Sequence, residues 1–166
     1  VGYFPGGLTE LTASHLQESA PRFLHQRLYE GRYVVVMRRG HPLAGRPIAL
    51  ADFCAARHLL VSFSGRPFGF VDEALAAQGL ARRVVLTVNQ FFTAGRVVST
   101  SDLLTVLPLH FLGATGMEAE LTHCELPLDL PHVHVDALWR RQQHGQSSHR
   151  WLREAVFRAV GKGVPA

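Results

Sequence analysis

Short apolar runs alternate with amphipathic stretches along most of this 166-residue chain. Runs rich in β-branched, aliphatic and aromatic residues predict strands, whereas apolar residues three or four positions apart predict helices. The expected strands are 23–29, 33–37, 59–62, 84–88, 103–107, 121–126 and 133–139. The expected helices are 51–55, 70–78, 92–99, 109–112 and 148–160. Strand, helix, strand, helix, strand over residues 59–107 predicts right-handed crossovers and a parallel sheet.

Local signals refine this pattern at three places. Glu30-Gly31-Arg32 separates the first two strands and predicts a hairpin. The strand at 59–62 is apolar for most of its length, which is typical of a strand buried on both faces. The last helix carries its apolar residues as one stripe, made of Trp151, Leu152, Ala155, Val156, Ala159 and Val160.

The order of elements predicts two α/β lobes joined by two chain crossings. We expect the first lobe to combine 1–61 with 132–166 and the second to span 62–131. In such folds, ligands bind in the cleft between lobes, where strand ends meet helix N-termini. The opening residues 1–7 read as a strand end that runs into a Gly/Pro turn, which favours a fragment whose first lobe is incomplete at its N-terminus.

Composition narrows the class of protein. The chain is 47% hydrophobic and 18% charged, as in soluble globular proteins. Cys54 and Cys124 lie far apart in apolar runs, which indicates two buried, reduced thiols. No stretch approaches the roughly 18 apolar residues of a membrane-spanning helix. No basic segment followed by an apolar leader opens the chain. We therefore expect a cytoplasmic protein with no membrane partner.

The net charge of +4 raises the question of nucleic-acid binding. Nearly all the basic residues are Arg, and the Arg pairs lie apart, at 38–39, 82–83 and 140–141. They flank strands and turns instead of sharing one helix face. We interpret them as solvated strand ends, so the charge alone does not predict a DNA-binding surface.

Several motifs, taken in order, resemble the effector-binding domain of LysR-type transcription regulators. RLYEGRYVVVMRRGHPL (27–43) resembles the family's hairpin and His-Pro-Leu turn, and LVSFSG (60–65) with GFVD (69–72) resembles its effector loop and helix. The other matching motifs are VNQF (88–91), SDLLTVLP (101–108), LWR (138–140) and HRWLR (149–153). The resemblance covers about residues 23–160. It is strongest to the branch of the family that responds to aromatic inducers, which includes the nodulation-type and naphthalene/salicylate-type regulators.

The resemblance implies a two-lobed α/β fold of the type 2 periplasmic-binding-protein-like class, with mixed sheets. It implies a regulatory domain that needs no cofactor, binds a small aromatic acid or phenol-like effector, and self-associates as a dimer or tetramer. DNA would be bound only through the family's N-terminal helix-turn-helix, which has no counterpart among these residues. Phe68 stands where the branch often has a polar residue, and Gln90 where it often has His. The resemblance therefore does not imply that this chain binds the same carboxylate inducers as that branch.

The candidate effector site is the loop 62–69 and the start of the helix at 92–99. The loop ends at a helix N-terminus, where unpaired amides and the helix dipole favour an anion. Hydroxyl groups and the Arg66 guanidinium offer donors to a carboxylate, and Phe68 offers an apolar wall. The predicted set is Phe4, Pro5, Ser62, Ser64, Gly65, Arg66, Phe68, Gln90 and Phe91. In the alternative interpretation the loop is a plain turn with a solvated Arg.

Two other classes of protein stay open at this point. His132-x-His134-x-Asp136 alternates onto one strand face and resembles part of a metal site, which supports a metal-dependent hydrolase as an alternative. Such enzymes need more ligands than the histidines that follow. The loop lacks a Gly-x-Ser-x-Gly elbow, and the cysteines lack an electropositive setting. A free-standing solute-binding protein with the same cleft is the other alternative. We predict a ligand-sensing domain that is neither an enzyme nor a metalloprotein.

Overall fold

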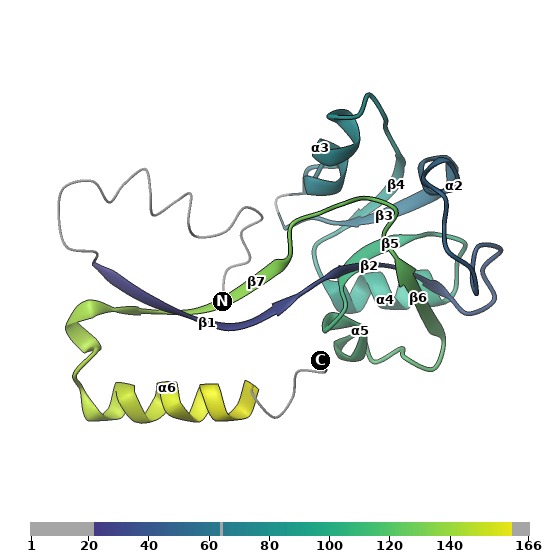
Figure 1. The fold of residues 1–166 in the computed structure, drawn as a ribbon. Coiled ribbons are helices and arrows are strands. Elements are labelled where there is room, and N and C mark those ends of the chain that lie inside the picture. Colours follow the sequence, from purple (N-terminus) through teal and green to yellow (C-terminus); the bar gives the residue numbers. More distant parts are fainter. Residues whose placement is uncertain (1–21, 64, 161–166) are drawn as a thin grey trace. The chain divides into compact units, whose positions relative to one another are not determined.

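The computed structural model describes residues 22–63 and 65–160, and the chain divides into two compact units (Figure 1). The central unit is Gly31–Val133, and the terminal unit combines Val1–Glu30 with His134–Ala166. The strands are β1 (Phe23–Gly31), β2 (Tyr33–Arg38), β3 (Arg57–Val61), β4 (Arg83–Val88), β5 (Thr105–Pro108), β6 (Leu121–Glu125) and β7 (Val133–Arg140). The helices are α2 (Leu50–Ala55), α3 (Phe70–Ala76), α4 (Phe91–Ser99), α5 (Phe111–Ala114) and α6 (Ser147–Val160), with a 3-10 turn η1 (Arg141–Gln143). The predicted elements are confirmed, with ends shifted by one or two residues.

A mixed sheet forms the centre of the central unit. β2 pairs antiparallel with both β5 and β6, and β3 pairs parallel with β4. A parallel bridge between His58 and Leu104 connects the two groups of strands, with Leu59 N donating to Leu104 O at 2.8 Å. The predicted parallel crossover is confirmed for β3–α3–β4. Its continuation is mixed, as the resemblance implied, because β5 also pairs antiparallel with β2.

Strand β2 shows why helices cover both faces of this sheet (Figure 1). Val34 and Val36 are completely buried in one apolar cluster with residues of α4. Val35 and Met37 point to the opposite face and pack in a second cluster with residues of α2 and α3. Because side chains of a strand alternate between faces, an unbroken apolar run requires a core on each side.

The predicted hairpin between the first two strands is wrong. β1 pairs with β7 in a two-stranded sheet, while β2 lies between β5 and β6. Glu30-Gly31-Arg32 instead carries the chain from β1 of one sheet into β2 of another. A turn signal specifies a local reversal only where the two flanking runs also pair best with each other, and here β2 finds apolar partners on both edges.

Two predictions from composition are wrong in part: that the paired Arg residues are solvated, and that both cysteines are buried. The Arg82 side chain is only 1% exposed and pairs with Asp72, so it is not a solvated strand end. Burial of its guanidinium requires the carboxylate partner that it has.

Cys54 and Cys124 are both free, but they are half-buried instead of buried. Within the described chain, no helix combines the length and apolar character needed to cross a membrane.

The predicted lobe boundaries, 1–61 with 132–166 and 62–131, remain a prediction about the regulatory lobes. The compact units differ in one respect, since β2, α2 and β3 belong to the same unit as residues 62–131.

Gly95 in α4 gives a first testable consequence of the packing between α4 and α5. A methyl group there would stand 2.5 Å from Thr115 Cβ and 2.9 Å from its Cγ2. Thr115 is held by a hydrogen bond from its hydroxyl to Leu112 O at 2.6 Å. Gly95→Ala is expected to lower the free energy of unfolding by about 1–2 kcal/mol, because overpacking outweighs the helix preference of Ala. Urea unfolding measures this change.

Gly145→Ala is the control for this prediction. Among the described residues, no atom lies within 4 Å of the methyl group that it adds. Its effect on stability should stay within about 0.5 kcal/mol. A Gly95→Ala variant as stable as the parent chain would contradict the close packing of α4 on α5.

Candidate functional site

The carboxyl ends of the parallel strands β3 and β4 meet at one edge of the central unit. Ser62, the first residue after β3, donates its backbone N–H to Val88 O at 2.8 Å and is only 9% exposed. Gly65 N donates back to Ser62 O at 3.3 Å, and Gly65 has φ of +72°, a conformation that favours glycine. The loop therefore turns sharply at the point where strand ends and helix starts converge, as expected for a ligand site of this fold class.

A row of aromatic rings lies beside this strand edge. The rings of Phe63 and Phe91 meet edge to face at 5.8 Å, and Phe91 stacks on Phe111 at 4.3 Å. We call these three residues the aromatic row. Phe63 is 60% exposed, whereas Phe91 packs against the core cluster of α4. The exposed ring at one end is backed by two half-buried rings, so the row presents a supported apolar surface to a ligand.

The structure brings together some of the predicted site residues and leaves others apart. Ser62 and Phe91 lie at the same strand edge, and Phe63 connects them. Gln90 is exposed and precedes α4 without capping it by a side-chain hydrogen bond, and Gly65, Arg66 and Phe68 are exposed on the loop. Phe4, Pro5 and Ser64 lie outside the described residues. Phe63 and Phe111 were not among the predicted site residues, although Phe63 stands inside the predicted loop.

The Asp72 carboxylate lies at the start of α3, where the sequence predicts an anion site. The Asp72 carboxylate accepts the Gly69 N–H at 2.8 Å and also binds Arg82, with Nε–Oδ1 at 2.8 Å and Nη2–Oδ2 at 3.0 Å. Burial by itself raises the pKa of Asp72, but the hydrogen bond and charge of Arg82 outweigh it and lower the pKa below its usual value. A carboxylate already occupies the helix start, so an effector anion would have to bind elsewhere at this edge.

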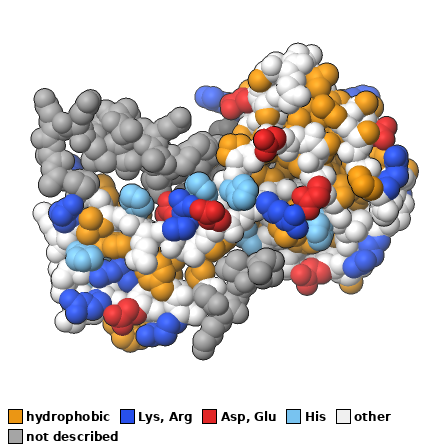
Figure 2. Space-filling model, viewed as in Figure 1, with side chains coloured by type: hydrophobic (Ala, Val, Ile, Leu, Met, Phe, Trp, Pro, Cys, Tyr) orange, Lys and Arg blue, Asp and Glu red, His pale blue; other side chains and the backbone are white. Residues whose placement is uncertain are grey.

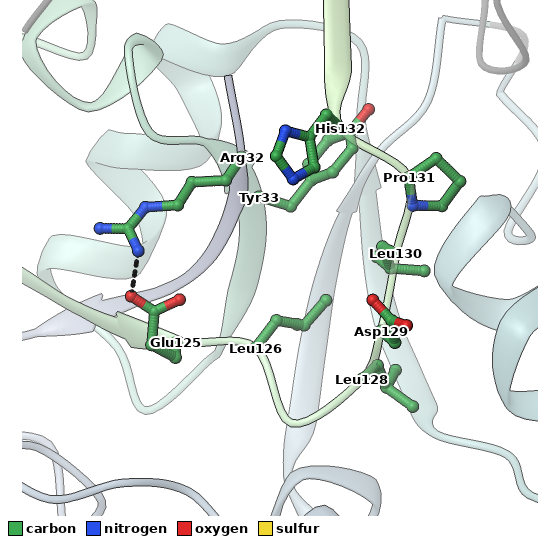
Figure 3. Close-up of a pocket in the computed structure, with 9 residues that line it drawn as sticks. All are labelled: Arg32, Tyr33, Glu125, Leu126, Leu128, Asp129, Leu130, Pro131 and His132. Carbon is green, nitrogen blue, oxygen red and sulfur yellow. Dashed lines mark hydrogen bonds and ion pairs between the residues drawn. The ribbon is translucent and has the colours of Figure 1, made fainter. Parts of the chain in front are cut away.

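A separate cavity of about 190 Å³ lies in the central unit, where the chain leaves β6 (Figure 3). Arg32 and Glu125 form an ion pair at 2.5 Å on one side, while leucines, Asp129 and His132 line the rest. Both partners of that ion pair are more than half exposed. The cavity therefore offers little preorganised charge, and among the described residues of the predicted effector and metal sites only His132 lines it.

The metal-site interpretation of His132, His134 and Asp136 has little support. Arg27 Nε donates to the Asp136 carboxylate, and His134 Nε2 lies 3.7 Å from Glu30 Oε1. Among residues 22–63 and 65–160, no three His, Cys, Asp or Glu side chains are grouped so that they could hold a metal ion. Asp136 therefore forms an ion pair with Arg27 on the β1–β7 strand pair.

The comparison with protein families decides the class of this chain. The LysR substrate binding domain family matches residues 7–161. The chain belongs to this family. It is therefore a domain of LysR-type transcription regulators, and the resemblance that the motifs carried is confirmed.

Relatives of this LysR substrate-binding domain agree with that assignment. The HTH-type transcriptional activator NahR of Pseudomonas putida is 27% identical over 151 residues, which are 91% of this chain and 50% of that protein. Nodulation protein D 2 of Rhizobium tropici is 23% identical over 134 residues, which are 80% of this chain and 43% of that protein. These relatives confirm the predicted branch. The chain spans about half the length of the curated relatives that it matches.

A solved structure supports the fold of the LysR domain. The regulatory domain of MexT, a transcriptional activator in Pseudomonas aeruginosa, has a TM-score of 0.70 and 27% identity, covering 90% of this chain and 76% of that one. The predicted α/β fold class with mixed sheets is confirmed by this likeness and by the strand pairing described above.

Proposed function

We propose that this LysR domain senses a small aromatic effector at the carboxyl edge of β3 and β4. Phe63 and Phe91 would form the wall for the aromatic body. Ser62, Arg66 and Gln90 would supply the polar contacts. In the parent regulator, binding would change how a helix-turn-helix region outside residues 1–166 engages DNA, in a cytoplasmic dimer or tetramer.

The observation that carries this proposal is the aromatic row beside the joined strand ends. Aromatic rings prefer edge-to-face or offset contacts, and the exposed Phe63 ring offers such a contact to a bound ring. Arg66 is exposed on the same loop and can form a bidentate pair with a carboxylate. The site thus combines an apolar wall with few polar groups, as small-molecule sites do.

A thermal-shift screen with benzoate, salicylate, phenol and a flavonoid tests the proposal. A ligand at a hundred times its dissociation constant adds about 2.7 kcal/mol to the free energy of unfolding. For a domain of this size we expect the midpoint to rise by roughly 5–10 °C. EDTA should leave the shift unchanged, whereas a shift that appears only with added zinc would favour the hydrolase alternative.

Phe63→Ala identifies the surface responsible for the shift. Loss of the exposed ring should weaken binding by about tenfold, since an aromatic pair contributes about 0.5–1.5 kcal/mol beyond its buried area. Phe92→Ala is the matched control, because Phe92 is 63% exposed on α4 and does not belong to the aromatic row. Equal weakening in the two variants would contradict a role for the aromatic row.

A further inference from the structure

The terminal unit contains a groove of its own between the β1–β7 strand pair and α6, with a volume of about 380 Å³. Its apolar wall consists of Phe23, Leu138, Leu152 and Val156. Three of these side chains are about half exposed, Phe23 at 48%, Leu138 at 49% and Leu152 at 51%. Figure 2 shows apolar and basic side chains interspersed over these elements. We call this cavity the terminal groove.

The ionisable side chains among the described residues that line the terminal groove are all basic. Arg140, His149 and Arg153 contribute to the lining, and no Asp or Glu of the described residues does. The acidic residue nearest in sequence on β7, Asp136, is engaged by Arg27. Charge complementarity therefore favours an anionic ligand with an apolar body.

Arg153 is held in place by its neighbours. Its Nη2 donates to His144 O at 2.8 Å, and its guanidinium carbon lies 4.9 Å from the centroid of the Trp139 ring. Trp139 in turn donates its Nε1–H to His144 Nδ1 at 3.2 Å. These contacts hold the guanidinium plane beside the groove.

One donor of this guanidinium has no partner. Within the described part of the chain, Arg153 Nη1 is buried and makes no hydrogen bond. Buried polar atoms in folded proteins are nearly always hydrogen-bonded, and an orphaned cationic donor is costlier than a neutral one. Because Nη1 is covered, a carboxylate in the groove would supply the missing acceptor once the covering side chains move aside.

We propose that the terminal groove binds a small carboxylate with an apolar body, and that Arg153 is its carboxylate-binding residue. The volume lies in the range of small-molecule sites. This second site shares no residue with the proposed effector site in the central unit, so either proposal can fail without the other.

Tryptophan fluorescence tests the terminal groove selectively. Both tryptophans of the chain, Trp139 and Trp151, belong to the terminal unit, and Trp139 lines the groove. Cyclohexanecarboxylate, which does not absorb with tryptophan, should change the emission of the 166-residue chain in a saturable way. For a ligand of this size we expect a dissociation constant on the order of 0.1–1 mM. Cyclohexylmethanol, its neutral analogue, should bind at least about tenfold more weakly.

Variants separate carboxylate binding from a structural effect. Arg153→Gln should weaken binding of the acid about tenfold or more, whereas Arg150→Gln, an exposed position on the same helix, should not change it. Val156→Phe keeps the guanidinium but fills part of the groove, so it should weaken the acid and the alcohol alike. Circular dichroism confirms that each variant is folded.

Two results would overturn the proposal. One is an unchanged emission of the folded chain at saturating acid, the result expected if the groove receives a protein segment instead. The other is equal binding of acid and alcohol, with no loss in Arg153→Gln. Neither result bears on the Phe63 test, which reports on the central unit.

Discussion

Asp72→Asn is expected to lower the free energy of unfolding by about 3–5 kcal/mol, the largest effect of any single change considered. Asp72 is 10% exposed and is the partner of the nearly inaccessible Arg82 guanidinium. It also accepts the N–H of Gly69, the residue that precedes α3. The variant leaves a buried cation without its counter-ion and loosens the junction between the loop 62–69 and α3. Urea unfolding followed by circular dichroism measures the loss.

The controls for Asp72→Asn use one exposed pair and one compensating change. Glu125→Gln breaks the Arg32–Glu125 pair, whose side chains are 54% and 68% exposed, and should cost less than about 1 kcal/mol. Asp72→Asn combined with Arg82→Met removes both charges and should recover most of the lost stability. A single Asp72→Asn variant that unfolds like Glu125→Gln would contradict the account of a buried ion pair.

Acidification from pH 7 to pH 4 is expected to remove about 3 kcal/mol of stability through His58 alone. Burial lowers the pKa of His58 to about 4, while an unfolded histidine titrates near 6.5. Between these values the unfolded chain binds more protons than the folded one. The free energy of unfolding therefore stays constant above about pH 6.5 and falls as the pH approaches 4. Urea unfolding at a series of pH values measures the slope.

The surroundings of His58 explain this sensitivity. The side chain is completely buried, its Nε2–H donates to Phe53 O at 2.7 Å, and its ring meets the Phe53 ring at 4.6 Å. Its Nδ1 has no hydrogen-bond partner within the described chain, so protonation there would bury a charge, and Arg82 would repel it. Burial also lowers the pKa of His41 and His110, which act in the same direction.

The variant His58→Gln separates the contribution of His58 to the pH dependence of stability from the contributions of the other histidines. The glutamine amide can donate to Phe53 O but does not titrate. The pH dependence of the variant should therefore be shallower by about 3 kcal/mol over the same range. Equal slopes in the two proteins would show that His58 does not limit the stability of the folded chain in acid.

Most helices and strands of the central unit could be predicted from the sequence, because a strand buried on both faces is a nearly unbroken apolar run. The apolar runs at 33–37 and 59–62 predicted strands that do lie inside the sheet. Strand pairing was less predictable. The Glu30-Gly31-Arg32 signal reports local turn chemistry, whereas the partners of β2 depend on contacts with β5 and β6 far along the chain.

In the candidate site, too, the local turns could be predicted from the sequence, whereas contacts between side chains far apart in the chain could not. The loop and the helix start were predicted in the right places because Gly, Pro and Ser mark such turns. The occupation of the α3 N-terminus by Asp72 was not predicted, since it depends on Arg82 being folded inward. Phe63 was missed although it stands in the LVSFSG motif, and Phe111 lies outside every motif, because their contacts with Phe91 appear only once α4 and α5 are packed.

The most direct test of the central claim is an amide NMR titration of the isotope-labelled chain with salicylate. We predict saturable shifts of the Ser62, Phe63 and Phe91 amides, at the carboxyl edge of β3 and β4, and their loss in Phe63→Ala. Unchanged amides at these three positions under saturating salicylate and benzoate, or shifts confined to the tryptophan indoles of the terminal unit, would contradict an aromatic effector site in the central unit.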